Sequence, residues 1–66
     1  MEPLPKSFNR SEIARLASVP RYAVTNAENK LDGKTPTANE IAIVNAIEAE
    51  ANVAIGWVKR QRRGWK

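Results

Sequence analysis

Neither cysteine nor histidine occurs in this chain of 66 residues. Without cysteine the fold cannot be held by disulfides, and the usual structural zinc sites lack both kinds of ligand. Without histidine the commonest general base of enzymes is missing, and no imidazole is present to activate a serine nucleophile. We therefore expect no metal, no cofactor, no small-molecule substrate and no enzymatic activity.

Long apolar runs are also absent. No stretch approaches the roughly 18 apolar residues of a membrane span, and the opening Met-Glu-Pro-Leu-Pro lacks the apolar core of a signal peptide. The lack of cysteine fits a reducing compartment, so we expect a cytoplasmic protein with no membrane contact. Residues 1–66 should form a single small domain, close to the lower limit at which a chain folds unaided.

Acidic residues are missing from the last part of the sequence. Residues 59–66 carry five Lys and Arg side chains and no acid, whereas residues 1–58 carry six against seven acids. The net charge of +4 therefore belongs to the C-terminal segment. Concentrated positive charge suits a polyanion such as nucleic acid, and it equally suits a solvated end that keeps the protein soluble.

Prolines and capping residues divide the first half of the chain. Residues 1–7 contain two prolines and should form an irregular arm. Asn9 is a good N-cap for a helix predicted over residues 10–17. Pro20 ends any continuing helix and suits the first position of a new one. Residues 10–31 should therefore hold a helix, a tight turn and a second helix that starts at Pro20.

A third helix is predicted over residues 38–51. Thr37 and Glu40 form a capping box at its start, and Ile41, Val44 and Ile47 place an apolar stripe along one face.

Residues 53–66 are harder to assign. Their apolar residues continue at helical spacing, but those at 53, 55 and 57 also alternate as in a strand, and Gly56 weakens a helix by about 1 kcal/mol. We favour a basic fourth helix over residues 53–62. The expected fold is then all-α, with about four helices.

The second helix has an unusual polar face. Its apolar residues share one side, and the opposite side carries a phenol, a hydroxyl and two amides: Tyr22, Thr25, Asn26 and Asn29. In the major groove of DNA, amides can hydrogen-bond to both the donors and the acceptors on base edges, and Thr or Tyr can contact a thymine methyl group. The alternative is an ordinary surface near a fraying helix end. Four such residues beside a tight turn favour sequence-specific binding to double-stranded DNA.

The same segment follows a known spacing of apolar, polar and small residues. The matching positions are Phe8, Asn9, Arg10, Ile13, Ala14, Val19 and Val24, with Gly33 and Pro36 after the second helix. In these positions the chain resembles the helix-turn-helix of lambda repressor and Cro-type regulators, the XRE-like family. The similarity extends to about residue 53. It implies a compact lambda-repressor-like domain that reads the major groove with residues 20–31.

Three departures from that pattern have structural consequences. Ser18 stands where the family prefers Gly, at a turn position that can require a positive φ angle. Pro20 replaces the usual Ser or Thr cap. The family's first helix is absent, because residues 1–7 cannot form it. We expect three residues of the C-terminal segment to cover the apolar surface so exposed, packing on Phe8, Leu16 and Val44 or against a second copy: Ile55, Trp57 and Val58.

The resemblance and the helical geometry assign roles to the polar residues. Base contacts are expected from Arg21, Tyr22, Thr25, Asn26 and Asn29. Phosphate contacts are expected at helix ends, in the exit loop and in the C-terminal segment: Asn9, Arg10, Ser11, Lys30, Lys34, Thr35, Lys59, Arg60, Arg62 and Arg63. One such domain reads only a few base pairs, so we expect a homodimer on a pseudo-palindromic operator.

Size and resemblance together indicate a small transcriptional repressor of phage or mobile-element type. Two other functions stay open. A protein-interaction module, such as an antitoxin or anti-repressor, would use the same face on a protein with little dependence on salt. An RNA binder would use Trp57, Trp65 and the basic tail, and would prefer single strands.

Overall fold

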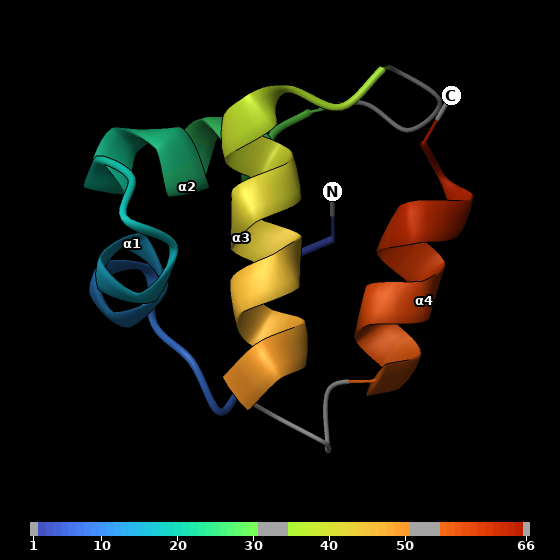
Figure 1. Cartoon of the computed structure of the whole chain (residues 1–66), viewed down its shortest axis with the longest axis horizontal. Coiled ribbons are helices and arrows are strands. Elements are labelled where there is room, and N and C mark those ends of the chain that lie inside the picture. The colour runs from blue at the N-terminus through green and yellow to red at the C-terminus, as the bar shows by residue number, and fades with distance from the viewer. Residues whose placement is uncertain (1, 31–34, 51–54, 66) are drawn as a thin grey trace.

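The computed structural model describes residues 2–30, 35–50 and 55–65. Within these ranges the chain forms four helices, which are α1 (Arg10–Ala17), α2 (Arg21–Glu28), α3 (Ala38–Glu50) and α4 (Ile55–Arg63). Helix is the only regular structure there, which confirms the all-α expectation. The helix predicted over residues 53–62 is confirmed from residue 55 onward, while residues 51, 53 and 54 of the predicted third and fourth helices lie outside the described residues. α3 lies between α1 and α2 on one side and α4 on the other (Figure 1).

Both ends of α1 follow the local sequence. The side-chain oxygen of Asn9 accepts a hydrogen bond of 2.8 Å from the backbone N–H of Glu12. Ser18 adopts the left-handed conformation, with φ 57° and ψ 43°. The N–H groups of Ser18 and Val19 bond back to the carbonyls of Arg15 and Ala14, the paired bonds of a Schellman motif. The expected positive φ angle at Ser18 is therefore confirmed.

α2 is shorter than the sequence predicts. Pro20 is its N-cap and not its first residue, because its ψ angle of 151° is extended, and the helix starts at Arg21. α2 ends at Glu28, earlier than the expected residue 31. The reason is a tightened last turn, in which the N–H of Lys30 bonds to the carbonyl of Ala27. Leu31 lies outside the described residues.

α3 is rotated relative to the expected stripe. The hydroxyl of Thr37 accepts a 3.1 Å hydrogen bond from the N–H of Glu40, which is one of the two bonds of the predicted capping box. The return bond to the Glu40 carboxylate does not form, because that carboxylate contacts Lys30 and Trp65. The face turned inward carries Ile43, Val44, Ile47 and also Glu40. Ile41, expected in the core, is instead 39% exposed because it lies off the face that those residues share. The prediction of Ile41 as a core residue was wrong.

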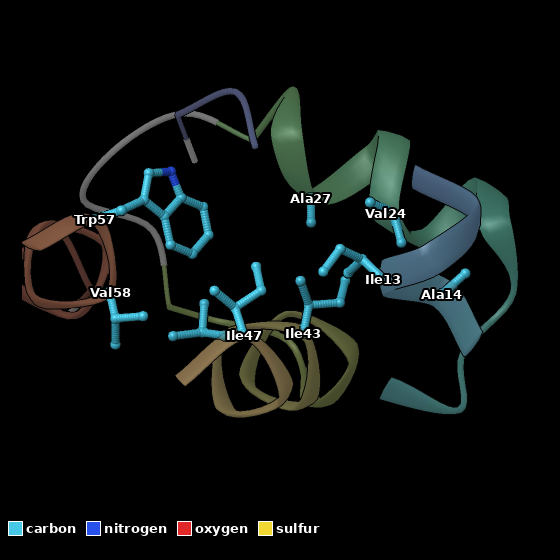
Figure 2. Close-up of a cluster of buried hydrophobic side chains, with 9 residues drawn as sticks. Ile13, Ala14, Val24, Ala27, Ile43, Ile47, Trp57 and Val58 are labelled. Atoms are coloured by element: carbon cyan, nitrogen blue, oxygen red, sulfur yellow. The ribbon is translucent and has the colours of Figure 1, made fainter. Parts of the chain in front are cut away.

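The core joins residues of all four helices. It is built from Ile13, Ala14, Val24, Ala27, Ile43, Val44, Ile47, Trp57 and Val58, most of them labelled in Figure 2. Burying each large apolar side chain contributes about 1.5–3 kcal/mol, and the chain has no cysteine with which a disulfide could supplement it. The backs of α1 and α2 are therefore fixed against α3.

Trp57 and Val58 of α4 lie in this core, as expected. Ile55, expected with them, is 44% exposed because it lies off the face shared by Trp57, Val58 and Gln61. Leu16, the expected packing partner on α1, is also exposed.

The N-terminal segment, residues 2–8, is not helical and crosses from α4 to α2. The carbonyl of Pro3 accepts a hydrogen bond from the indole of Trp57 at 3.0 Å. The N–H of Leu4 donates to Glu28 Oε2 at 3.0 Å, and the N–H of Glu2 donates to Gln61 Oε1 at 3.0 Å. Leu4 and Phe8 pack against the core. This N-terminal segment, which we call the strap, and α4 together close the core.

Candidate nucleic-acid interface

The polar face of α2 points away from the core. Tyr22 is 67% exposed, and Arg21 and Asn26 are exposed beside it. Thr25 is half-buried, and Asn29 is exposed just beyond the end of the helix. We call Arg21, Tyr22, Thr25, Asn26 and Asn29 the reading face. The structure therefore places the five expected base-contact residues on one side of one helix.

The opposite side of α2 holds the helix in place. Ala23, Val24 and Ala27 are buried, and α2 packs against both α1 and α3. Residues on the reading face are thus carried by a backbone whose other side is fixed in the core.

A cavity of about 320 Å³ adjoins the reading face where α2 meets the start of α3. Its lining comes from both helices and includes Tyr22, Asn26, Lys30, Thr37, Asn39 and Glu40. The alanines of α2 form part of its wall, so the cavity combines small apolar surface with amide and hydroxyl groups.

Two expected phosphate contacts, Arg10 and Lys30, are paired with carboxylates. Arg10 Nε lies 2.7 Å from Glu28 Oε1, which joins the start of α1 to the end of α2. Lys30 Nζ lies 2.9 Å from Glu40 Oε2 and also donates to the carbonyl of Thr35. The Lys30 side chain is only 19% exposed, so it serves an internal ion pair in this structure.

Two cations of α4 are also paired. Arg60 Nε lies 3.1 Å from Glu2 Oε2. Arg62 binds Glu48 through both terminal nitrogens, at 2.6 and 2.8 Å, and donates to Asn45 at 2.9 Å. The hydrogen bonds from Arg62 lower the pKa of Glu48, against a slight opposing desolvation, and the same bonds raise the pKa of Arg62. Both side chains remain largely exposed, so the pair adds little stability.

Other cations have no ion-pair partner within the described ranges. On α4 these are Lys59 and Arg63, which are one helical turn apart, and on the side of α1 and α2 they are Arg15 and Arg21. At the start of α1, Asn9 and Ser11 are exposed, although the Asn9 oxygen is engaged as a cap. Thr35 is exposed, and Lys34 lies outside the described residues.

The residues that follow α4 contact the start of α3. Most of α4 is separated from α2 by α3 (Figure 1). Beyond α4, however, the indole of half-buried Trp65 donates a 2.8 Å hydrogen bond to Glu40 Oε1, at the first turn of α3. Glu40 therefore contacts both Trp65, which follows α4, and Lys30, which follows the last residue of the reading face.

Sequence reasoning did not find this role of Glu40. Its place in the capping box predicts the backbone contact with Thr37 but not the burial of its carboxylate, which is 3% exposed as a residue. The only signal was its spacing from Ile43 and Ile47, which puts all three on one helix face.

Comparison of the chain with protein-family models, with curated proteins and with solved structures gave no match. None of the described helices combines the length and the apolar character needed to cross a membrane.

Proposed function

We propose that this protein is a sequence-specific double-stranded DNA-binding transcriptional regulator that inserts α2 into the major groove. The observation that carries the proposal is the exposed reading face on a helix whose apolar back is fixed in the core. A recognition helix needs both properties, because base readout requires side chains held in one geometry while they remain open to the groove.

The chemistry of the reading face suits base edges. Asn26 and Asn29 each offer a donor and an acceptor, which match the N6 and N7 positions of adenine. Arg21, unpaired among the described residues, can bind guanine through its planar fork. Tyr22 and Thr25 add a hydroxyl and apolar contact for thymine methyl groups.

Groups around the reading face are expected to bind the DNA phosphates. The exposed start of α1 at Asn9 and Ser11 can direct backbone N–H groups toward one strand. Lys59 and Arg63 on α4, which have no ion-pair partner among the described residues, supply positive charge, and Arg10, Arg60 and Arg62 can exchange their carboxylate partners for phosphates. Exposed Thr35 can add a hydroxyl contact, Lys34 lies outside the described residues, and Lys30 stays with Glu40 in this structure. Neutralising several phosphates would make binding strongly dependent on salt.

We further propose a homodimer on a pseudo-palindromic operator, since one α2 reaches only a few base pairs. As a repressor of phage or mobile-element type, the protein would act in the bacterial cytoplasm or nucleoid. This biological role follows from the resemblance of residues 8–53 to Cro-like regulators.

Selection of bound duplexes from a random pool tests the proposal. We expect a shared preferred sequence, affinity for it well above that for random duplex, and a steep fall in affinity with added salt. Preference for single-stranded RNA would instead favour the RNA-binding alternative. Absence of any nucleic-acid binding, with salt-insensitive binding to a protein, would favour the interaction module.

A further inference from the structure

Glu40, the acid of the predicted capping box, also lies on the inward, apolar face of α3. It is 3% exposed and shares the inward face of α3 with Ile43, Val44 and Ile47. A buried carboxylate is costly unless its oxygens are paired. A leucine at this position would carry no such cost, so burial alone does not account for the acid.

The two oxygens of Glu40 hold two different elements. Oε2 forms an ion pair with Lys30 Nζ, two residues beyond the end of α2, at 2.9 Å, although the alignment is not that of a hydrogen bond. Oε1 accepts a 2.8 Å hydrogen bond from the indole Nε1–H of Trp65, which follows α4. Lys30 and Glu40 also line the cavity beside Tyr22 and Asn26. One carboxylate therefore joins the end of the reading face, the start of α3 and the basic C-terminal segment.

We propose that Glu40 is a positioning residue that sets the end of α2 against α3 and couples the basic C-terminal segment to the reading face. Its consequence for DNA rests on the function proposed above. A contact that orders Trp65 also orders the end of the reading helix, because both depend on the same buried charge. Sequence discrimination then depends on a residue that touches no base.

The first experiment needs no DNA. Amide hydrogen exchange is measured at residues 25–30 of the full chain in Trp65→Phe, which removes the indole N–H but keeps an aromatic ring. Glu48→Gln is the matched control, because it removes a different contact between α3 and α4 that does not involve α2. We expect exchange about fivefold faster in Trp65→Phe and unchanged in the control. Equal exchange in the two variants would overturn the coupling.

The second experiment separates positioning from stability. Glu40→Leu removes the buried charge and restores an apolar stripe on α3, and the Lys30 ammonium can reach solvent along its flexible stem. We expect a melting temperature equal to or above that of the unaltered chain. The ratio of affinities for the selected and random duplexes should nevertheless fall about fivefold or more. A stable variant with full discrimination would refute the positioning role.

Trp65→Phe serves in the same binding assay, so the inference stays open to refutation if Glu40→Leu does not fold. If the unaltered chain shows no duplex preference at all, the proposed function fails. The exchange measurement then still decides whether Glu40 couples Trp65 to α2.

Discussion

The indole N–H of Trp57 donates a 3.0 Å hydrogen bond to the backbone carbonyl of Pro3, 54 residues earlier in the chain. The bond satisfies the one polar atom of a side chain that is otherwise packed among Val58, Ile47 and their neighbours (Figure 2). It also fixes the strap formed by the N-terminal segment. Residues 2–8, which are not helical, thus close the core together with a tryptophan of α4.

Removing Trp57 should therefore unfold much of the protein. Trp57→Ala is expected to lower the free energy of unfolding by about 3–5 kcal/mol, a large share of the stability available to a domain of this size. Circular dichroism during heating measures the effect. Ile55→Ala is the control, because that side chain is 44% exposed, and it should change stability by about 0.5 kcal/mol at most. In a second test, residues 53–66 are deleted and the thermal melt is recorded by circular dichroism. We expect the cooperative unfolding transition to be lost, and an unchanged transition would contradict the role given to α4.

Ser18→Gly should stabilise the protein. Ser18 has a φ angle of 57°, and glycine enters this region without steric penalty, so we expect a gain of about 0.5–1 kcal/mol after the entropic cost of glycine. Chemical denaturation measures the change. Ser11→Gly makes the same chemical change inside α1, where it should cost about 0.5 kcal/mol. Two changes of the same sign would show that strain at Ser18 is not the cause.

Protonation of Glu48 should release Arg62. Because hydrogen bonds from Arg62 hold the pKa of Glu48 below its ordinary value, the pair stabilises the fold above the unfolded pKa of glutamate. That small contribution is lost as the pH falls through the lowered pKa of the folded state. Titration of the Glu48 carboxyl carbon by nuclear magnetic resonance should show a higher midpoint in Arg62→Gln. The same midpoint in both proteins would contradict the bidentate contact.

Loss of base readout and loss of phosphate binding should have different effects on affinity, which three variants can distinguish. Asn26→Ala is expected to cost about 1–3 kcal/mol on the preferred duplex and little on random DNA. Arg63→Ala should weaken binding to both and reduce the salt dependence by about one log unit per log unit of salt. Arg62→Ala should weaken both as well, but by less than Arg63→Ala, because Arg62 must first leave Glu48. Filter binding at several salt concentrations measures all three. Uniform losses for Asn26→Ala would remove it from the reading face.

The oligomeric state is open to direct measurement. We expect sedimentation to detect two chains on a duplex that carries a palindromic form of the selected sequence, and one half-site to bind much more weakly. The control duplex carries the same half-sites with five extra base pairs between them, which turns the sites to opposite sides of the helix. A monomer both free and on the palindrome would refute the dimer.

Local signals in the sequence predicted the local structure well. The cap at Asn9 and the capping role of Thr37 follow from short-range chemistry, and both are present. The positive φ angle at Ser18 was predicted from the family resemblance, and it is present too. The helices α1 and α3 start where those residues predict. The end of α2 was misjudged, because a tightened last turn has no marker as clear as a cap.

Contacts between residues far apart in the chain could not be predicted from the sequence. An apolar stripe fixes the rotation of a helix only within a residue or so. In α3 the neighbouring Glu40 is buried, whereas Ile41, which was predicted in the core, is exposed. The spacing of residues does not predict that Glu28 forms an ion pair with Arg10 and accepts a hydrogen bond from the N–H of Leu4. Nor does it predict the hydrogen bond from Trp65 to Glu40. These contacts depend on how the helices meet, and they decide which cations are open to DNA.

The strap also has a consequence for how the chain folds. Short helices joined by tight turns usually fold fast, since their contacts are near in sequence. Here Glu2 meets Gln61 across 59 residues and Pro3 meets Trp57 across 54, so the final closure must bring together distant parts of the chain. We expect the helices to assemble around α3 before the strap docks, which makes docking the slow, last event and the first to be undone on unfolding.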